Sequence, residues 1–371
     1  MRIPAADLRA QNQALRDELV DAFRRVLDSS AFINGEDVAA FEGEFAAFCE
    51  VPHAIGVANG TDALSLALRA LEIGPGDAVA VPAFTFAATG EAVCHVGARP
   101  VFVDIDRRTG NIDPQSLRET LQSTAVRAVI PVHLYGQPAP MRDVLDIAQQ
   151  HGAAVIEDAA QAHGARYHGR RAGSLGALAC FSFYPTKNLG ALGDAGAITT
   201  SDAFLAERLR ALRDHGQSRK YEHATIGFNS RLDSIQAAAL RIKLRHLDAW
   251  NARRREIARH YVEAMHGLRG ITPLAQSPDC EAVYHLFIVR CAERDDLRRY
   301  LEERGIATTI HYPFPLHVQP AFAPAGCSAG TMPAAEELAQ QVVALPMYPE
   351  LSDTAVDGVC AAVRDWTVRK A

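Results

Sequence analysis

Lys187 lies in the stretch FSFYPTKNLGALGDAG (residues 181–196), between an aromatic, polar run and a glycine-rich segment. A lysine held in a desolvated pocket has a lowered pKa and can form a Schiff base with a carbonyl compound. The small residues that follow Lys187 would leave open space around its amine. A solvated loop lysine is the alternative, because most lysines are surface charges.

A second candidate residue is a carboxylate at the end of an apolar run. The segment AAVIEDAAQAHGA (153–165) places Asp158 at or just beyond the end of a predicted buried strand. A buried carboxylate needs a partner, and a cationic group such as a protonated pyridine nitrogen would supply one. Gln161 and His163 follow closely and could hydrogen-bond the same ligand. An N-cap of the next segment explains Asp158 equally well.

Asn59-Gly60-Thr61-Asp62 links a strand-like run to a helical pattern. The N-terminus of such a helix offers free N–H groups and the positive end of the helix dipole, which suits a phosphate. Gly60 would permit close approach of the ligand. Simple N-capping by Thr61 or Asn59 is the alternative.

Taken together, a phosphate cradle, a strand-end aspartate and a lysine beyond a strand meet the needs of pyridoxal phosphate (PLP). The helix N-terminus and Ser182 would hold the phosphate, Asp158 would keep the ring nitrogen protonated, and Lys187 would carry the aldehyde. Phe86, in PAFTFAAT after another strand-like run, could stack on the ring face. Ordinary core packing also explains an isolated phenylalanine.

The elements that must position these residues follow a βαβ rhythm of apolar strands and helical patterns. This rhythm predicts an α/β fold with a mostly parallel central sheet flanked by helices. Ligands bind such sheets at the carboxyl ends of the strands. We expect residues 1–249 to form a large PLP-binding domain that includes the N-terminal helices, and 250–371 a smaller C-terminal α+β domain. The region from about 230 to 268 is predicted as one long helical region.

The composition is that of a globular protein, with 371 residues and a net charge of -6. The chain has no basic cluster for nucleic acid, no apolar run of about 18 residues for a membrane span and no signal peptide. Its seven cysteines form no C-x-x-C pair, which predicts reduced thiols and a cytoplasmic location. No metal site is predicted, and no G-x-G-x-x-G follows a strand, which argues against a Rossmann oxidoreductase.

The chain also resembles the nucleotide-sugar aminotransferases, the DegT-like branch of the fold-type I PLP-dependent aminotransferases. The resemblance runs nearly end to end and implies the same fold, with PLP or its amine form PMP as cofactor. It rests on eleven motifs in order: ANGTDAL (58–64), VPAFTFAAT (81–89), PVFVDID (100–106), PVHLYGQ (131–137), VIEDAAQAHGA (155–165), FSFYPTKNLGALGDAG (181–196), RDHGQ (213–217), GFNSRLD (227–233), YHLF (284–287), HYPFPLH (311–317) and LPMYPEL (345–351).

This resemblance implies that Lys187 holds PLP as a Schiff base and then moves protons. Asp158 would pair with the pyridine nitrogen, and Gln161 would contact the ring hydroxyl. Asn229 would reach the phosphate from the partner subunit, which implies a homodimer with shared active sites. The implied cofactor-binding residues are Thr61, Asp62, Phe86, Asp158, Gln161, Ser182, Lys187 and Asn229. The implied substrate-binding residues are Tyr184, Tyr221, His311, Tyr312 and His317.

The implied reaction moves an amino group from L-glutamate to a nucleotide-linked keto sugar, as in deoxyamino sugar biosynthesis. The motifs GTDAL, and HYPFPLH followed by QPAF (319–322), resemble members that act at C3 of a dTDP-3-keto-6-deoxyhexose. A UDP-linked 3-keto sugar is an alternative. Members that dehydrate sugars have histidine in place of the lysine, so Lys187 favours transamination over a PLP-dependent sugar dehydratase. A non-catalytic PLP-binding regulator is a further alternative, although the chain has no basic arm for DNA.

Overall fold

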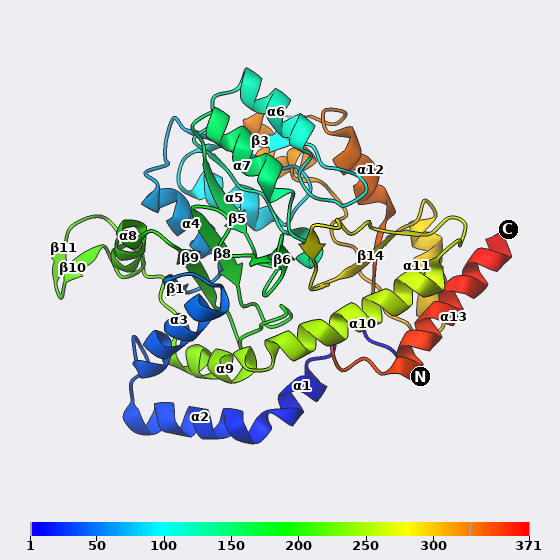
Figure 1. Cartoon of the computed structure of the whole chain (residues 1–371), viewed down its shortest axis with the longest axis horizontal. Helices are drawn as coiled ribbons and strands as arrows, with labels where there is room; N and C mark the ends of the chain where they lie inside the picture. The colour runs from blue at the N-terminus through cyan, green and yellow to red at the C-terminus, as the bar shows by residue number, and fades with distance from the viewer. Residues whose placement is uncertain (1, 327, 371) are drawn as a thin grey trace.

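The computed structural model describes residues 2–326 and 328–370 and contains a large seven-stranded sheet covered by helices on both faces (Figure 1). The strand order is β1-β9-β8-β5-β4-β2-β3. Only β9 runs antiparallel to its neighbours, so the predicted mostly parallel sheet is confirmed. The strands are β1 (His53–Val57), β2 (Ala78–Pro82), β3 (Arg99–Val103), β4 (Ala128–Val129), β5 (Ala154–Asp158), β8 (Leu178–Ser182) and β9 (Gly196–Thr200).

The central strands are apolar on both faces because helices cover both faces, and every residue of β2 is buried. One face is covered by α4 (Gly60–Ala70), α5 (Ala87–His95) and α8 (Ala203–Arg213). The other face is covered by α3 (Glu36–Phe48), α6 (Pro114–Ser123), α7 (Met141–Gln150) and α9 (Ser234–Leu244).

The predicted single helical region from about 230 to 268 is wrong in one respect, since it is two helices. Helix α9 ends at Leu244, and α10 (Leu247–Met265) begins after a short break. The first turn of α10 still packs on the core of α9 through Leu247, and from Ile257 onward α10 packs on a separate C-terminal core. α9 contacts α3 and α2 (Arg16–Ser29), which follows α1 (Arg9–Ala14), whereas α10 packs against α13 (Asp353–Lys370).

A second, three-stranded antiparallel sheet lies toward the C-terminus, with the order β12-β14-β15. It consists of β12 (Thr272–Pro273), β14 (Phe287–Arg290) and β15 (Val342–Leu345), and it shares a core with α10, α11 (Arg294–Glu302) and α13. The predicted domain division between residues 249 and 250 falls inside α10 and remains a prediction.

The remaining elements are short. The hairpin of β10 (Gln217–Arg219) and β11 (Glu222–His223) projects from the body beside α8, at the left of Figure 1. The others are β6 (Arg166–Tyr167), β7 (Arg170–Arg171), β13 (Cys280–Glu281), η1 (Leu134–Gly136), η2 (Leu316–Val318), η3 (Pro320–Ala325) and α12 (Pro333–Gln341). None of the described helices is both long and apolar enough to cross a membrane.

Several of the predicted site residues lie at the edge of the large sheet that is formed by the carboxyl ends of its parallel strands. β5 and β8 run parallel, so Asp158 and Ser182, their last residues, lie at the same edge. β1 runs in the same direction, because both β1 and β8 are antiparallel to β9. The loop from β1 into α4 therefore reaches this edge as well.

Candidate active site

A cavity of about 870 Å³ opens at this edge of the sheet. It brings together ten of the predicted residues from segments far apart in the sequence. These residues are Thr61, Asp62, Phe86, Asp158, Gln161, Ser182, Tyr184, Lys187, His311 and Tyr312.

The N-terminus of α4 forms one wall of the cavity. Asn59 caps this helix, since its Oδ1 accepts a hydrogen bond from the Asp62 N–H at 2.8 Å. A Cβ on Gly60 would lie only 2.6 Å from the Cβ of Ser182, so glycine lets the helix end and Ser182 pack together. N–H groups and a hydroxyl thus line one corner, which is the arrangement that holds a phosphate.

Asp158 is a buried carboxylate with two hydrogen-bond donors among the described residues. Oδ2 accepts from the Thr89 hydroxyl at 2.8 Å, and Oδ1 accepts from the Ala160 N–H at 3.2 Å. Burial raises the pKa of Asp158, and these two bonds together with the nearby Lys187 offset only part of that effect. A cationic ligand group beside Asp158 would relieve this cost.

Lys187 is half-buried and lines the same cavity. Burial lowers the pKa of Lys187 to about 8, while the Asp158 carboxylate acts in the opposite direction. The loop that carries it is tight, because a Cβ on Gly190 would lie 2.2 Å from the Pro185 carbonyl oxygen. Gly190 therefore serves backbone packing within this loop.

Gln161, Tyr312 and Phe86 form the neighbouring wall. The Gln161 Oε1 accepts from the Tyr135 N–H at 2.6 Å, and its Nε2 donates to the Tyr312 hydroxyl at 3.1 Å. The Phe86 ring lies 5.9 Å from the Tyr312 ring and is 57% exposed. An aromatic face this open to the cavity is available for a flat ligand ring.

Two histidines line the cavity, and only one was predicted. The pKa of His311 is lowered by burial and by the Lys187 amine, and its Nδ1 lies 3.2 Å from the Thr309 Oγ1. His285 was missed, although it lies within the YHLF motif. Its Nδ1 lies 3.2 Å from the Asn188 Oδ1, and burial lowers its pKa well below the ordinary value.

Four residues singled out in the sequence lie away from the cavity. Tyr221 is 80% exposed at the turn of the β10–β11 hairpin, and Asn229 is exposed on the loop before α9. His317 is buried, with its Nε2 2.9 Å from the Glu336 Oε1. His163 is also buried, packs against Phe181 and Phe183, and does not line the cavity.

The residues that are present fit PLP. The cavity offers a phosphate corner, an open aromatic face and an amine whose pKa allows it to lose its proton near neutral pH. The buried Asp158, which retains capacity for a cationic partner, is the observation that distinguishes a pyridine ring from other phosphate-bearing ligands.

Residues 13–364 match the model of the DegT/DnrJ/EryC1/StrS aminotransferase family. The chain belongs to this family. The predicted family, fold class and enzyme class are thereby confirmed. PLP or PMP as cofactor is also supported, since solved relatives from Streptococcus pneumoniae and Bacillus subtilis are described as PMP-bound.

Two curated relatives illustrate the range of this aminotransferase family. The chain is 49% identical to the dTDP-3-amino-3,4,6-trideoxy-alpha-D-glucose transaminase of Streptomyces venezuelae, over 99% of this chain and 97% of that protein. It is 46% identical to a UDP-N-acetyl-3-dehydro-alpha-D-glucosamine 3-aminotransferase of Acidithiobacillus ferrooxidans, over 98% and 97%. The crystal structure of S. venezuelae DesV with a ketimine intermediate superposes with a TM-score of 0.96, at 49% identity and 99% and 98% coverage.

Proposed function

We propose that this aminotransferase transfers an amino group from L-glutamate to C3 of a dTDP-linked 3-keto-6-deoxyhexose. The observation that carries the proposal is the 49% identity, over nearly the whole chain, to a transaminase named for a dTDP-3-amino sugar. The lysine at position 187 supports amination over dehydration, as the sequence motifs predict. The six described cysteines are free thiols, which supports the predicted cytoplasmic location.

PLP, when bound, supplies an aldehyde that accepts amines and a ring that withdraws electrons from the reacting carbon. In this proposal Lys187 holds the cofactor and serves as the acid–base group. A pKa of about 8 lets its amine accept and return a proton near neutral pH. Asp158 keeps the pyridine nitrogen protonated, and Thr89 holds the Asp158 carboxylate in place.

The remaining cavity residues orient the ligands. Thr61, Asp62 and Ser182 hold the phosphate at the N-terminus of α4, and Phe86 covers one ring face. Gln161 contacts the ring hydroxyl. Tyr184, His311 and Tyr312 take the sugar side of the cavity, where they supply hydroxyl and imidazole groups for sugar hydroxyls.

A homodimer completes the site in this proposal. Asn229 and Tyr221 lie away from the cavity of their own chain, so they would act on the cavity of the partner. Exposed apolar side chains near these positions support a surface that a partner subunit covers. Phe228 precedes Asn229 and is exposed, and the exposed Ile33 forms a β-bridge with Asp233 nearby in the sequence.

The reaction can be tested with purified enzyme. Glutamate alone should convert the absorbance of bound PLP to that of PMP. A panel of dTDP- and UDP-linked 3-keto and 4-keto sugars should then show the fastest amine transfer to the dTDP-linked 3-keto sugar, with product NMR locating the amine at C3. Absence of PMP formation with any amino acid would contradict transamination. A clear preference for a UDP sugar would overturn only the substrate assignment.

Subunit complementation tests the shared site. A Lys187→Ala chain and an Asn229→Ala chain should each form impaired homodimers. Mixed at equal amounts after refolding or co-expression, they should recover about a quarter of wild-type activity, because half of the dimers then carry one intact site. Recovery absent while mixed dimers are present would contradict the contribution of Asn229 across subunits.

A further inference from the structure

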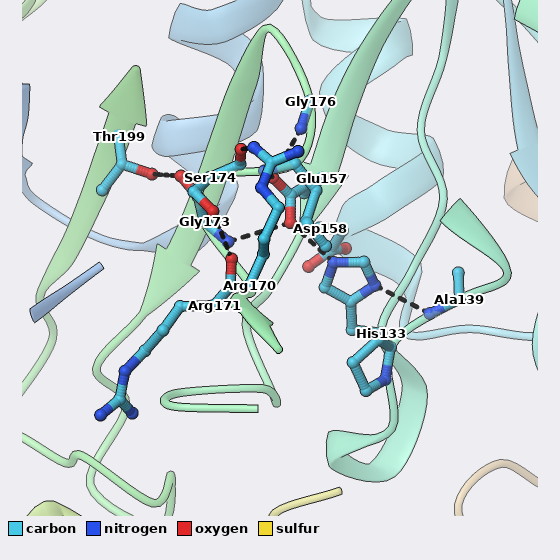
Figure 2. A network of polar contacts seen from close by, with 12 residues as sticks. His133, Ala139, Glu157, Asp158, Arg170, Arg171, Gly173, Ser174, Gly176 and Thr199 are labelled. Carbon is cyan, nitrogen blue, oxygen red and sulfur yellow. Dashed lines mark hydrogen bonds and ion pairs between the residues drawn. The ribbon is translucent and has the colours of Figure 1, made fainter. Parts of the chain in front are cut away.

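A second carboxylate, Glu157, lies beside Asp158 in β5 but on the other face of the sheet, and it is fully buried. Its Oε1 accepts a hydrogen bond from the Leu175 N–H at 2.7 Å. The Gly176 N–H donates to the same Oε1 at 2.8 Å, and the Gly173 N–H donates to Oε2 at 2.9 Å (Figure 2). Burial alone would raise the pKa of Glu157. The bonds from His133 and this backbone outweigh burial and hold the pKa below its ordinary value.

His133 supplies the fourth bond, and its tautomer follows from its partners. Its Nδ1 accepts from the Ala139 N–H at 3.1 Å, so the proton of a neutral ring must be on Nε2. The Nε2–H then donates to the Glu157 Oε2 at 2.9 Å (Figure 2). Both side chains are fully buried, so the bond is shielded from water.

The same histidine also holds Asp158 through the backbone. The His133 N–H donates to the Asp158 carbonyl oxygen at 3.0 Å, and the Asp158 N–H donates to the Pro131 carbonyl oxygen at 2.9 Å. His133 thus hydrogen-bonds both acidic residues at the end of β5, Glu157 through its ring and Asp158 through its main chain.

The loop around Glu157 leads directly into the other half of the cavity. Residues 173–176 precede β8, which pairs with β5 in the register Asp158 to Cys180 and ends at Ser182. Glu157 therefore ties the strand that carries Asp158 to the start of the strand that leads to Ser182 and Lys187. The Thr199 hydroxyl secures the same loop by donating to the Gly173 carbonyl oxygen at 2.7 Å (Figure 2).

We propose that the Glu157–His133 pair is a positioning device that sets Asp158 against the cofactor ring and against the Ser182–Lys187 side of the cavity. The pair does not touch the ligand and acts through Asp158. This inference rests on the proposed function of the cavity, because it assumes that Asp158 meets the cofactor.

A double-mutant cycle separates positioning from general support of the fold. PLP dissociation constants are measured by fluorescence quenching on apoprotein for the wild type, His133→Asn, Asp158→Asn and the double variant. The asparagine can still accept from the Ala139 N–H but cannot reach Glu157. His133→Asn should weaken PLP binding about tenfold in the wild-type background, the scale of a hydrogen bond to a buried charge. It should weaken binding less than about twofold when Asp158 is already replaced.

His133→Gln is the matched control, because its amide can still donate near the position of Nε2. It should lose less PLP affinity than His133→Asn. Equal losses for the two variants, or the same loss for His133→Asn in both Asp158 backgrounds, would overturn the proposal. If wild-type apoprotein failed to bind PLP, the proposed function itself would fall instead.

Thr199→Val provides a second route if His133→Asn does not fold. It removes only the hydroxyl bond to the Gly173 carbonyl and loosens the loop around Glu157. Its loss of PLP affinity should be about threefold and again confined to proteins that keep Asp158. An equal loss in Asp158→Asn protein, or no loss at all, would contradict the positioning role.

Discussion

Glu157 and Asp158 are sequence neighbours with opposite environments, because side chains alternate between the faces of a strand. Glu157 accepts four hydrogen bonds and has a lowered pKa, whereas Asp158 accepts two and has a raised pKa because of burial. A carboxylate that the protein already satisfies has no capacity for a ligand. Asp158 accepts fewer hydrogen bonds and therefore retains capacity for a ligand, and Asp158 is the carboxylate that lines the cavity.

Two lysines repeat this contrast. Burial lowers the pKa of both Lys187 and Lys243 to about 8. The Lys243 Nζ donates to the Gly190 carbonyl oxygen at 2.9 Å and so anchors the loop that carries Lys187. A shifted pKa alone does not mark a reactive lysine, and access to the cavity separates the two.

The largest effect should come from removing Lys187. Lys187→Ala should lower transaminase activity by about 10³-fold or more and abolish borohydride fixation of PLP, because its amine is the proposed attachment point and acid–base group. Lys243→Met should keep the fixation site but lower the free energy of unfolding by about 1–3 kcal/mol, since a buried carbonyl loses its donor. Peptide mapping of the borohydride-reduced protein checks the fixation site, and urea unfolding checks the stability of Lys243→Met. If borohydride still fixed PLP in the Lys187→Ala protein, Lys187 would not be the attachment point.

Replacing the two carboxylates should separate activity from stability. Asp158→Asn should lower activity by about 10²–10³-fold without lowering apoprotein stability, since its charge serves the ligand. Glu157→Gln should lower the free energy of unfolding by about 3 kcal/mol, because an amide N–H then faces buried donors. Steady-state kinetics and urea unfolding provide the two measurements. The reverse pattern would break the contrast between the two faces of β5.

The same pair should give opposite pH dependence of apoprotein stability. Folded Asp158 holds its proton more tightly than the unfolded group with pKa 3.8, so it costs stability as pH rises above that value through its folded pKa. Glu157 contributes stability that is lost as pH falls below 4.5 through its lowered folded pKa.

Relative to wild type, Asp158→Asn should therefore gain stability between about pH 4 and pH 7, whereas the cost of Glu157→Gln should grow over the same range. Urea unfolding at the two pH values gives both differences. Parallel pH trends for the two variants would show that their charges do not differ as described.

The smallest effect should come from the donor to Asp158. Thr89→Val removes the hydroxyl and keeps a side chain of similar volume. It should weaken PLP binding about three- to tenfold. Thr85→Val is the matched control, because the Thr85 Oγ1 lies 3.1 Å from the Thr89 Oγ1 rather than bonding Asp158. Its loss should be smaller, and titration of apoprotein with PLP measures both. Equal losses would show that the bond to Asp158 is not the relevant contact.

Much of the fold and cavity could be predicted because the signals are local. Apolar runs predicted strands β5 and β8, and polar residues at their ends predicted where a ligand would bind. Thr89 and His285 could not be found this way, since a single threonine or histidine has no pattern of its own. Only packing of α5 against the sheet brings Thr89 to Asp158, across 69 positions of the chain.

Other differences have the same physical origin. The helical period continues through residues 245–246, but the helix is interrupted there, and α10 passes from the core of α9 to the C-terminal core along its length. His317 ends the motif HYPFPLH, yet its partner is Glu336 in α12 and it does not line the cavity. Tyr221 and Asn229 lie outside the cavity of a single chain, and only the proposed homodimer would bring them to a cavity.

The sequence by itself determined the α/β class, the family and the strand-end positions of the candidate site residues, because periodicity and motif order follow from the linear chain without knowing which segments meet. Only the tertiary structure decided which acidic residue of the pair Glu157-Asp158 is left for a ligand. Four donors from His133 and residues 173–176 converge on Glu157, while Asp158 faces the cavity. That outcome depends on which groups meet across the sheet, and no local pattern records it.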